Sequence, residues 1–550
     1  MSRFLDMLLA AAVRTDRGMT TGEPKAPVRR TWAEVHATAL DMAAALQAGT
    51  AALPGLTSGS AVGVLAGEPA TIAPAAQAVW LTGGSVTMLH QPTARTDLAA
   101  WAEDTVSVLK MIDARLVLLG PPFDALAPVL TERGIAFRTF DELTGAGTIT
   151  PDPSVAGEGD TALLQLTSGS TAEPKAVRIT HGNLHANITA MQVGAKLDVE
   201  NDRMVSWLPL FHDMGMVGFL TVPMVVGLEL ITVTPVDFLG RPVLWAELIS
   251  KYGGTVTAAP NFAYAVLARQ LARADGPLDL SSLRVALNGA EPIDAAAVAA
   301  FVDAGARFGL RPESVLAAYG MAETALGVSF APPMTGLDVD EIDAEQLETH
   351  RLAVPGTGRS FPKLGPPLPG IEVRVVDDEG AVRGEREVGI LQLRGPSVTP
   401  GYLTVHGPVA TQDAEGWLDT GDEGYLVDGQ VVVCGRRKDV IIMGGRNIYP
   451  TDIERAAVEA SDVRAGNAVA VRLSAGDGRR RETFAVVVES RKAGDADAEA
   501  VIRKDVTSHV FSAVGVRPAE VVVLGPGSLP KTPSGKLRRA ATAELVAART

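Results

Sequence analysis

Residues 164–175 read Leu-Gln-Leu-Thr-Ser-Gly-Ser-Thr-Ala-Glu-Pro-Lys, a strand-like run that enters a loop of small residues. Small side chains let backbone N–H groups approach an anion closely, and hydroxyl groups add further donors. The ammonium group of Lys175, after Pro174, supplies a point charge for phosphate. The spacing is not the GxxxxGK[ST] pattern of P-loop NTPases. We therefore predict a phosphate-binding loop, against the alternative of an ordinary Ser/Thr/Gly turn, formed by Thr167, Ser168, Gly169, Ser170 and Thr171.

The sequence around this loop alternates short apolar runs, rich in Val, Leu or Ile, with Ala-rich helical runs. Such alternation is typical of βαβ units with largely parallel sheets. No repeat of fixed period is visible, which argues against a solenoid. We therefore expect an α/β fold. Its predicted strands include residues 60–67, 114–120, 229–234, 255–260 and 283–289, and its predicted helices include 245–252 and 294–306.

The sequence changes character near residue 365, where short strands are separated by Gly- and Pro-rich turns. This pattern predicts a small antiparallel, barrel-like subdomain over about 365–436. After it, strands at 468–473 and 483–490 and a helix at about 498–514 predict a compact α+β domain.

A charged run, Arg436-Arg437-Lys438-Asp439, separates these two parts. We expect a domain boundary there, which gives an N-terminal domain of residues 1–436 and a small C-terminal domain of residues 437–550. The charge alone is equally expected of a solvated connector.

The composition limits the possible functions. The chain has 550 residues and a net charge of −15, which argues against a duplex nucleic-acid binder and against adhesion to an anionic membrane. The single cysteine, Cys434, excludes an intramolecular disulfide framework and a Cys-based metal site, and we interpret it as a packing residue. The eight histidines show no zinc-binding spacing.

Two apolar segments could suggest a membrane or a secretory signal. The N-terminal run is interrupted by Asp6 and has no convincing cleavage site, so we predict an amphipathic first helix. Residues 214–233 contain Pro223, Gly227 and Glu229, so a buried strand–helix segment is expected rather than a membrane span. We expect a cytoplasmic protein that is not an integral membrane protein.

Further motifs follow the loop along nearly the whole chain, and together they resemble those of the adenylate-forming superfamily. This superfamily includes acyl-CoA synthetases, fatty acyl-AMP ligases, luciferases and nonribosomal adenylation domains. The resemblance implies a large N-terminal domain, a mobile C-terminal domain, and ATP and Mg²⁺ as cofactors. The matching segments are TSGSTAEPK (167–175), NGAEP (288–292), YGMAET (319–324), WLDTGD (417–422), GRRKD (435–439), GGRNI (444–448) and PKTPSGK (530–536).

The resemblance assigns nucleotide contacts in the N-terminal part. Tyr319 would pack on adenine, since an aromatic face stacks on a base. Glu323 would ligate Mg²⁺, which prefers carboxylate oxygens. Taken alone, a core tyrosine and a helix-capping glutamate are the ordinary alternatives. The other nucleotide-binding positions that the resemblance implies are Asn288, Gly289, Ala290, Gly320, Met321 and Ala322.

Four further roles follow from the resemblance. Asp422 would accept the ribose hydroxyls, and Arg436 would donate to the same ribose. Lys536 would reach the α-phosphate and the substrate carboxylate, and would stabilise the charge that develops as pyrophosphate leaves. Lys438 would be the hinge. Without the resemblance, these are a turn aspartate, a surface arginine and solvated lysines.

Two features resemble fatty acyl-AMP ligases in particular. Many adenylate-forming enzymes have Thr directly before the magnesium glutamate, whereas here Ala322 stands there and Thr324 follows, which puts a hydroxyl contact to phosphate in doubt. The segment SWLPLFHDMG (206–215) would place His212 beside the acyl carboxylate, and Met214 and Gly215 along the acyl tunnel. A satisfied core histidine is the alternative for His212.

The interval from Glu323 to Gly365 is longer than in many acyl-CoA synthetases and contains the acidic run DVDEIDAEQLETH. We call residues 335–363 the inserted segment. Fatty acyl-AMP ligases carry an insertion here, thought to dock on the C-terminal domain and hinder its thioester-forming position. A solvated acidic flap is the alternative.

Together these features predict a fatty acyl-AMP ligase that activates a medium- or long-chain fatty acid and passes it to the phosphopantetheine thiol of an acyl carrier protein, or of a carrier domain of a polyketide or peptide synthase. Arg479, Arg480 and Arg481 are candidates to receive an acidic carrier protein. A fatty acyl-CoA synthetase is the nearest alternative. An amino-acid adenylation domain, for which Asp237 is the only candidate ammonium partner, and a catalytically idle nucleotide-binding scaffold are further alternatives.

Overall fold

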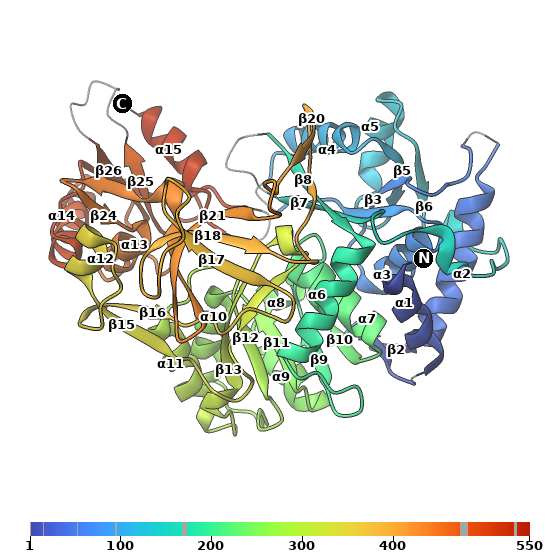
Figure 1. Ribbon diagram of the computed structural model, residues 1–550, viewed down its shortest axis with the longest axis horizontal. Coiled ribbons are helices and arrows are strands. Elements are labelled where there is room, and N and C mark those ends of the chain that lie inside the picture. The colour runs from blue at the N-terminus through green and yellow to red at the C-terminus, as the bar shows by residue number, and fades with distance from the viewer. Residues whose placement is uncertain are drawn as a thin grey trace. The chain divides into compact units, whose positions relative to one another are not determined.

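The computed structural model describes residues 2–14, 16–51, 53–93, 96–167, 173–473, 482–532 and 536–549. The chain packs as two compact units, whose elements are labelled in Figure 1. Unit 1 comprises Met1–Asp338, Leu364–Glu372 and Arg394–Leu418. Unit 2 comprises Val339–Lys363, Val373–Leu393 and Asp419–Thr550.

Unit 1 contains a first sheet of order β14-β13-β12-β11-β9-β10-β1-β2. Its six central strands pair in parallel, and only the edge strands β2 and β14 are antiparallel to their neighbours. The strands are β1 (Gly18–Thr21), β2 (Val28–Thr31), β9 (Arg203–Ser206), β10 (Glu229–Thr232), β11 (Val256–Ala259), β12 (Val285–Asn288), β13 (Val315–Gly320) and β14 (Gly327–Phe330).

A second sheet of unit 1 has the order β20-β19-β8-β7-β4-β3-β5-β6. The strands from β7 to β6 pair in parallel, whereas β8, β19 and β20 continue the sheet as antiparallel neighbours. The strands are β3 (Ala61–Leu65), β4 (Ser85–Met88), β5 (Ala114–Leu119), β6 (Phe137–Thr139), β7 (Thr161–Thr167), β8 (Lys175–Thr180), β19 (Gly401–Thr404) and β20 (Gly407–Ala410).

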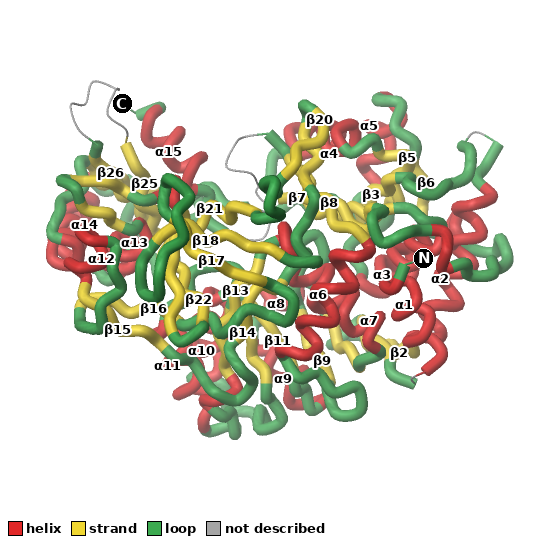
Figure 2. Tube along the Cα trace, viewed as in Figure 1, coloured by secondary structure: helices red, strands yellow, loops and turns green. Residues whose placement is uncertain are grey.

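Helices connect most of these strands, and Figure 2 shows the alternation. The predicted amphipathic first helix is confirmed as α1, whose Phe4, Leu5 and Leu8 are buried. Capping boxes fix where α2, α6 and α8 begin. The α-helices of unit 1 are α1 (Arg3–Arg14), α2 (Trp32–Ala48), α3 (Pro69–Leu81), α4 (Leu98–Met111), α5 (Ala127–Glu132), α6 (His181–Gly194), α7 (Val222–Val226), α8 (Pro235–Gly240), α9 (Val243–Tyr252), α10 (Asn261–Leu271) and α11 (Ala295–Ala306).

The apolar segment 214–233 forms a π-helix (Met214–Thr221), then α7 and β10, all of it buried. The predicted buried strand–helix segment is therefore confirmed. Across the described ranges, no helix has both the length and the apolar character needed to cross a membrane.

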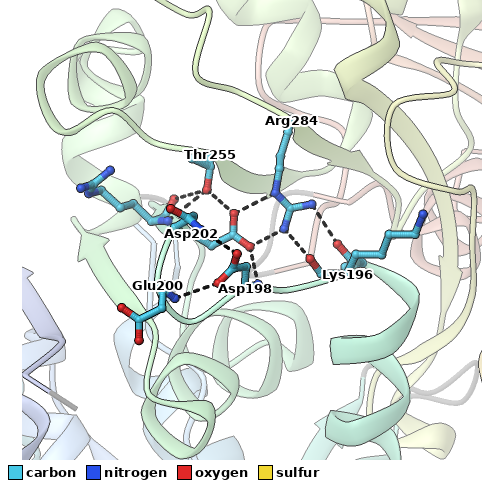
Figure 3. A network of polar contacts seen from close by, with 9 residues as sticks. Lys196, Asp198, Glu200, Asp202, Thr255 and Arg284 are labelled. Carbon is cyan, nitrogen blue, oxygen red and sulfur yellow. Dashed lines mark hydrogen bonds and ion pairs between the residues drawn. The ribbon is translucent and has the colours of Figure 1, made fainter.

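A buried ion pair aligns three strands of the first sheet, as Figure 3 shows. Arg284, which directly precedes β12, donates through Nε to Asp202 Oδ1 at 2.8 Å. Thr255, at the entry to β11, donates through Oγ1 to the same oxygen at 2.7 Å. Asp202 is buried at the entry to β9. The amino ends of β9, β11 and β12 are thus held together, and their carboxyl ends emerge at one edge of the sheet.

Unit 2 contains four small sheets, of order β17-β18-β21-β22, β15-β16, β23-β24 and β25-β26-β27. The strands are β15 (Val339–Asp343), β16 (Gly358–Pro362), β17 (Glu372–Val376), β18 (Gly389–Arg394), β21 (Leu418–Val427), β22 (Gln430–Arg436), β23 (Ile441–Met443), β24 (Arg446–Ile448), β25 (Ala468–Leu473), β26 (Thr483–Glu489) and β27 (Glu520–Leu524). The helices are α12 (Ala344–His350), α13 (Pro450–Val458), α14 (Ala496–Val514) and α15 (Arg539–Ala547).

The strands of residues 365–436 do not stay in one sheet. Strands β17, β18, β21 and β22 form a four-stranded sheet, whereas the β19–β20 hairpin extends the second sheet of unit 1. The edge of β8 offers unpaired backbone groups, and β19 satisfies them. The domain boundary near residue 436 stays a prediction. The compact unit 2 begins before that residue and also takes in most of the inserted segment.

Candidate active site

The carboxyl ends of β12 and β13 bring two of the predicted nucleotide-binding motifs together. The two strands run in parallel with Asn288 opposite Ala317, so the residues that follow each strand emerge at the same edge. A Cβ on Gly289 would lie 2.9 Å from Ala318 O, so glycine permits the close approach of the two backbones. Ala290 adopts a left-handed φ of 68° in the turn that follows.

Two polar atoms at strand ends are buried and have no hydrogen-bond partner within the described part of the chain: Asn288 Oδ1 and Thr167 Oγ1. An unsatisfied buried polar atom costs free energy unless a ligand or water completes it. Both atoms therefore fit a site that is completed by a bound molecule. The remaining predicted loop residues, Ser168, Gly169, Ser170 and Thr171, lie outside the described residues.

Lys175 and Glu323, predicted to contact phosphate and Mg²⁺, lie close together. Lys175 Nζ is 3.8 Å from Glu323 Oε1. Tyr402 contacts both of them, because its hydroxyl donates to Glu323 Oε1 at 2.7 Å and Lys175 Nζ lies 3.9 Å from the centre of its ring. Tyr402 was not predicted from the sequence, since a Gly-Tyr pair at a strand start carries no signal by itself.

The residues around Glu323 explain two sequence features. Thr324 is fully buried and its hydroxyl donates to Met321 O at 3.0 Å, so this threonine completes a backbone turn. It does not replace the threonine that many relatives carry at the place of Ala322. A Cβ on Gly320 would lie 2.3 Å from Leu326 O, so the turn also requires glycine there.

Tyr319, the predicted adenine neighbour, is half-buried at the end of β13. Its hydroxyl lies 3.9 Å from Met321 Sδ. The Tyr319 ring therefore remains partly accessible, as a stacking surface requires.

His212 lies just before the π-helix, and its Nδ1 is 2.7 Å from Asp213 Oδ1. A second histidine, His90, which we did not predict, packs edge-on against Phe211 with ring centres 5.7 Å apart. Burial, and secondly the proximity of His212, lower the pKa of His90 to about 4. The His90 imidazole is therefore neutral at pH 7, and it packs against Phe211, the residue before His212. π-Helical turns are frequent at functional sites.

In unit 2, Asp422 and Arg436 face each other across β21 and β22. Arg436 Nε lies 2.8 Å from Asp422 Oδ1, and Arg436 Nη1 donates to Thr420 O at 3.3 Å. The Asp422 side chain is 6% exposed and that of Arg436 is 52% exposed. An anchored carboxylate beside an accessible guanidinium suits the two hydroxyls of a ribose.

Lys536 and Lys438 lie elsewhere in unit 2. Lys536 is half-buried, and its backbone N–H donates to Thr532 Oγ1 at 3.0 Å while Thr532 N donates to Lys536 O at 2.7 Å. Lys438 is exposed on a short 3₁₀ turn, Arg437–Asp439, directly after β22. Their predicted roles with substrate and as a hinge stay predictions.

Two other residues discussed in the sequence analysis, Cys434 and Asp237, have structural roles. Cys434 is buried in unit 2, and burial raises the pKa of its thiol, which agrees with packing. Asp237 forms the capping box of α8, because its Oδ2 accepts hydrogen bonds from Thr234 N and Thr234 Oγ1. The run Arg479, Arg480 and Arg481 lies outside the described residues.

The donor set fits a magnesium ion that is shared with substrate phosphates. Among the residues whose placement is described, no three His, Cys, Asp or Glu side chains converge as a metal site. Mg²⁺ is usually bound through one or two carboxylates together with phosphate oxygens. Glu323, with a mostly buried carboxylate beside the Lys175 ammonium, matches that pattern.

Comparison with known proteins agrees with this geometry. Residues 10–403 match the model of a protein family described as AMP-binding enzyme. A Mycobacterium tuberculosis protein named as a ligase, Rv1013, is 55% identical over 99% of this chain and 100% of its own length. The long-chain-fatty-acid–AMP ligase FadD28 of M. tuberculosis is 34% identical over 70% of each chain. A solved structure from work on fatty acyl-adenylate ligases from E. coli and L. pneumophila has a TM-score of 0.88 and 31% identity, covering 100% of this chain and 99% of that one. The chain therefore belongs to the family of AMP-binding enzymes.

Proposed function

We propose that the chain activates a medium- or long-chain fatty acid with ATP, forming acyl-AMP and releasing pyrophosphate. The observation that carries this proposal is the meeting of Lys175 and Glu323 next to Thr167, which lies opposite Lys175 at the start of the predicted phosphate-binding loop. The name of FadD28, a long-chain-fatty-acid–AMP ligase, supports a fatty acid as the substrate. We also propose that this reaction takes place in the cytoplasm.

Each proposed role is one that the family resemblance implies, and the chemistry of the side chain supports it. A carboxylate oxygen of the fatty acid attacks the α-phosphorus, a new P–O bond forms, and the bond to pyrophosphate breaks. Lys175 would bind the phosphates that leave, and Lys536 would stabilise the charge that develops at the α-phosphate. Tyr319 would stack on adenine, and Asp422 with Arg436 would bind the ribose.

Glu323 would hold Mg²⁺, which neutralises phosphate charge when it is bound. His212 would lie beside the fatty-acid carboxylate and orient it. Met214 and Gly215 are buried in the π-helix, and their place along an acyl tunnel remains part of the proposal.

We further propose that the acyl group passes to the phosphopantetheine thiol of a carrier protein, and that Lys438 is the hinge for this step. The packing of Val339–Lys363 into the same unit as residues 437–550 supports an inserted segment that restrains the C-terminal domain. Such a restraint would disfavour free CoA as the acceptor.

The alternatives are less well supported. In an amino-acid adenylation domain, a carboxylate binds the substrate ammonium, but Asp237 is already engaged in capping α8. A catalytically idle scaffold would have no need for the paired Lys175 and Glu323 or the paired Asp422 and Arg436.

The test is pyrophosphate release with a panel of fatty acids, followed by mass spectrometry of products with and without CoA and a carrier protein. We expect acyl-AMP from ATP and fatty acid alone, and acyl-carrier when the carrier is added. Formation of acyl-CoA would favour a CoA synthetase, and folded protein that is silent with every carboxylate would favour the scaffold.

A further inference from the structure

Tyr402 is the residue that links the phosphate lysine to the magnesium glutamate. We propose that Tyr402 is a positioning residue for Mg·ATP, whose hydroxyl orients the Glu323 carboxylate and whose ring supports the Lys175 ammonium. This inference rests on the proposed function, because it takes Glu323 as the residue that holds Mg²⁺ and Lys175 as the one that contacts phosphate.

The three contacts show why a bridging residue is needed. Lys175 Nζ and Glu323 Oε1 are 3.8 Å apart, which is beyond hydrogen-bond length. The Tyr402 hydroxyl donates to that same oxygen at 2.7 Å, and its ring centre lies 3.9 Å from Lys175 Nζ. Tyr402 therefore contacts both charged groups directly, whereas these groups meet each other only as an ion pair beyond hydrogen-bond length.

The strand register fixes this arrangement. In the antiparallel pair of β8 and β19, Lys175 lies opposite Thr404 and Tyr402 lies opposite Val177. Tyr402 and Thr404 are two residues apart, so Tyr402 and Lys175 lie on the same face as diagonal neighbours. Long side chains at diagonal positions reach each other, as these two do.

The same stretch of chain also holds the backbone of Glu323. Thr399 N donates to Glu323 O at 2.7 Å, and Thr399 is fully buried. The Thr399 hydroxyl accepts a hydrogen bond from Gly401 N at 3.2 Å. Residues 399–402 thus fix both the main chain and the carboxylate of Glu323, so the carboxylate is oriented before any ligand arrives.

Tyrosine is suited to both charged neighbours. Its hydroxyl is a neutral donor that occupies Oε1 and cancels no charge, which leaves the carboxylate anionic for a cation. The negative face of its ring attracts the Lys175 ammonium group without bringing a second negative charge to the site.

Two substitutions separate the hydroxyl from the ring. Tyr402→Phe removes the hydrogen bond to Glu323 and keeps the aromatic face under Lys175. Tyr402→Leu removes both. The chain also offers a matched control triad, in which the Tyr252 hydroxyl donates to Glu23 and Lys251 Nζ lies 5.1 Å from the Tyr252 ring. Tyr252→Phe and Tyr252→Leu make the same changes at that second triad.

Binding is measured by calorimetry, with ATP titrated in excess Mg²⁺ and again in a chelator without metal. We expect Tyr402→Phe to weaken Mg·ATP binding about tenfold, the size of one hydrogen bond to a charged group, and to leave metal-free ATP binding unchanged. We expect Tyr402→Leu to weaken both, and both Tyr252 variants to bind like the wild type. The rate of pyrophosphate release should fall from the wild type to Tyr402→Phe to Tyr402→Leu. Tyr402→Phe should also need a higher Mg²⁺ concentration to reach half of its maximal rate.

Wild-type affinity for Mg·ATP in both Tyr402 variants would overturn the proposal, as would equal loss of metal-free and Mg²⁺-dependent binding in Tyr402→Phe. Circular dichroism and thermal unfolding establish that each variant is folded, and partial recovery from Leu to Phe shows that the ring contributes by itself. Failure of the proposed function gives a different result, because the wild type would then release no pyrophosphate with any fatty acid.

Discussion

Arg446 Nε donates a hydrogen bond of 2.6 Å to Glu348 Oε2. This contact joins α12 of the inserted segment to β24, which follows the predicted hinge. Arg359 also pairs with Glu348, and it reaches Asp452 Oδ2 of α13 at 3.0 Å. Glu348 is 3% exposed and Arg359 is 8% exposed, so these charges are compensated by each other more than by water.

Glu348→Gln should destabilise unit 2. Removing the carboxylate charge takes the Glu348 counter-charge from Arg446 and leaves Arg359 paired with Asp452 alone. Breaking a buried ion pair by removing one partner typically costs about 3–5 kcal/mol. Thermal and urea unfolding measure the loss. The control is Glu372→Gln, because the ion pair of Glu372 with Arg394 is on the surface, and little change is expected there.

The same Glu348→Gln variant should also accept CoA. If the inserted segment restrains the C-terminal domain through this contact, loosening it makes the thioester-forming position accessible, and mass spectrometry should detect acyl-CoA. A destabilised variant that still forms acyl-AMP and still excludes CoA would contradict the role of this contact in acceptor choice.

Arg351→Ala should raise the KM for ATP about tenfold and change kcat little. Arg351 ends α12 with a left-handed φ of 57° and contacts Glu423 Oε1 through Nη2 at 3.0 Å. Glu423 is 3% exposed and directly follows Asp422 on β21. Without Arg351, Glu423 loses an ion-pair partner, and β21 is held less firmly at the neighbouring Asp422, the proposed ribose-binding residue. Steady-state kinetics measure the effect, with Arg383→Ala, at an exposed arginine, as the control.

Local patterns could predict the strands and the motif residues. Residues 255–260 are a short apolar run between helical runs, and β11 (Val256–Ala259) lies within them. Tyr402 could not be predicted, because its role depends on the register between β8 and β19, strands that are far apart in the sequence. Register between distant strands is set by tertiary packing, which a single sequence does not reveal.

The inserted segment illustrates a second limit. Its acidic run has the composition of a solvated flap, yet Asp340 and Glu348 are buried. Arg386 compensates Asp340, and Arg446 compensates Glu348 together with Arg359 of the inserted segment itself. Docking was expected only from the family resemblance, because Arg386 and Arg446 lie outside the inserted segment and their pairing depends on tertiary packing.

Lys536→Ala should reduce pyrophosphate release about 100- to 1,000-fold, the usual effect of losing one donor that stabilises transition-state charge. The fold should persist, because the hydrogen bonds between Lys536 and Thr532 use only backbone atoms of the lysine. Lys504→Ala, at an exposed lysine of α14, is the control. Adenylation by Lys536→Ala at a rate near that of the wild type would refute the role.

His181 should make the protein less stable in acid. It is fully buried, with Nδ1 2.9 Å from Ser2 Oγ, and burial lowers its pKa to about 4 from the ordinary value of 6.5. The unfolded chain therefore binds a proton below about pH 6.5, whereas the folded chain does not until about pH 4, so stability falls as the pH drops through this window.

The expected loss from this histidine at pH 5, relative to pH 7.5, is about 2 kcal/mol in the free energy of unfolding. His181→Asn keeps a polar atom near Ser2 and removes the titration, so its unfolding free energy should depend less on pH by that amount. Urea unfolding at the two pH values measures the difference, with His406→Gln at a surface histidine as the control. An unchanged pH dependence in His181→Asn would show that other groups cause the acid sensitivity.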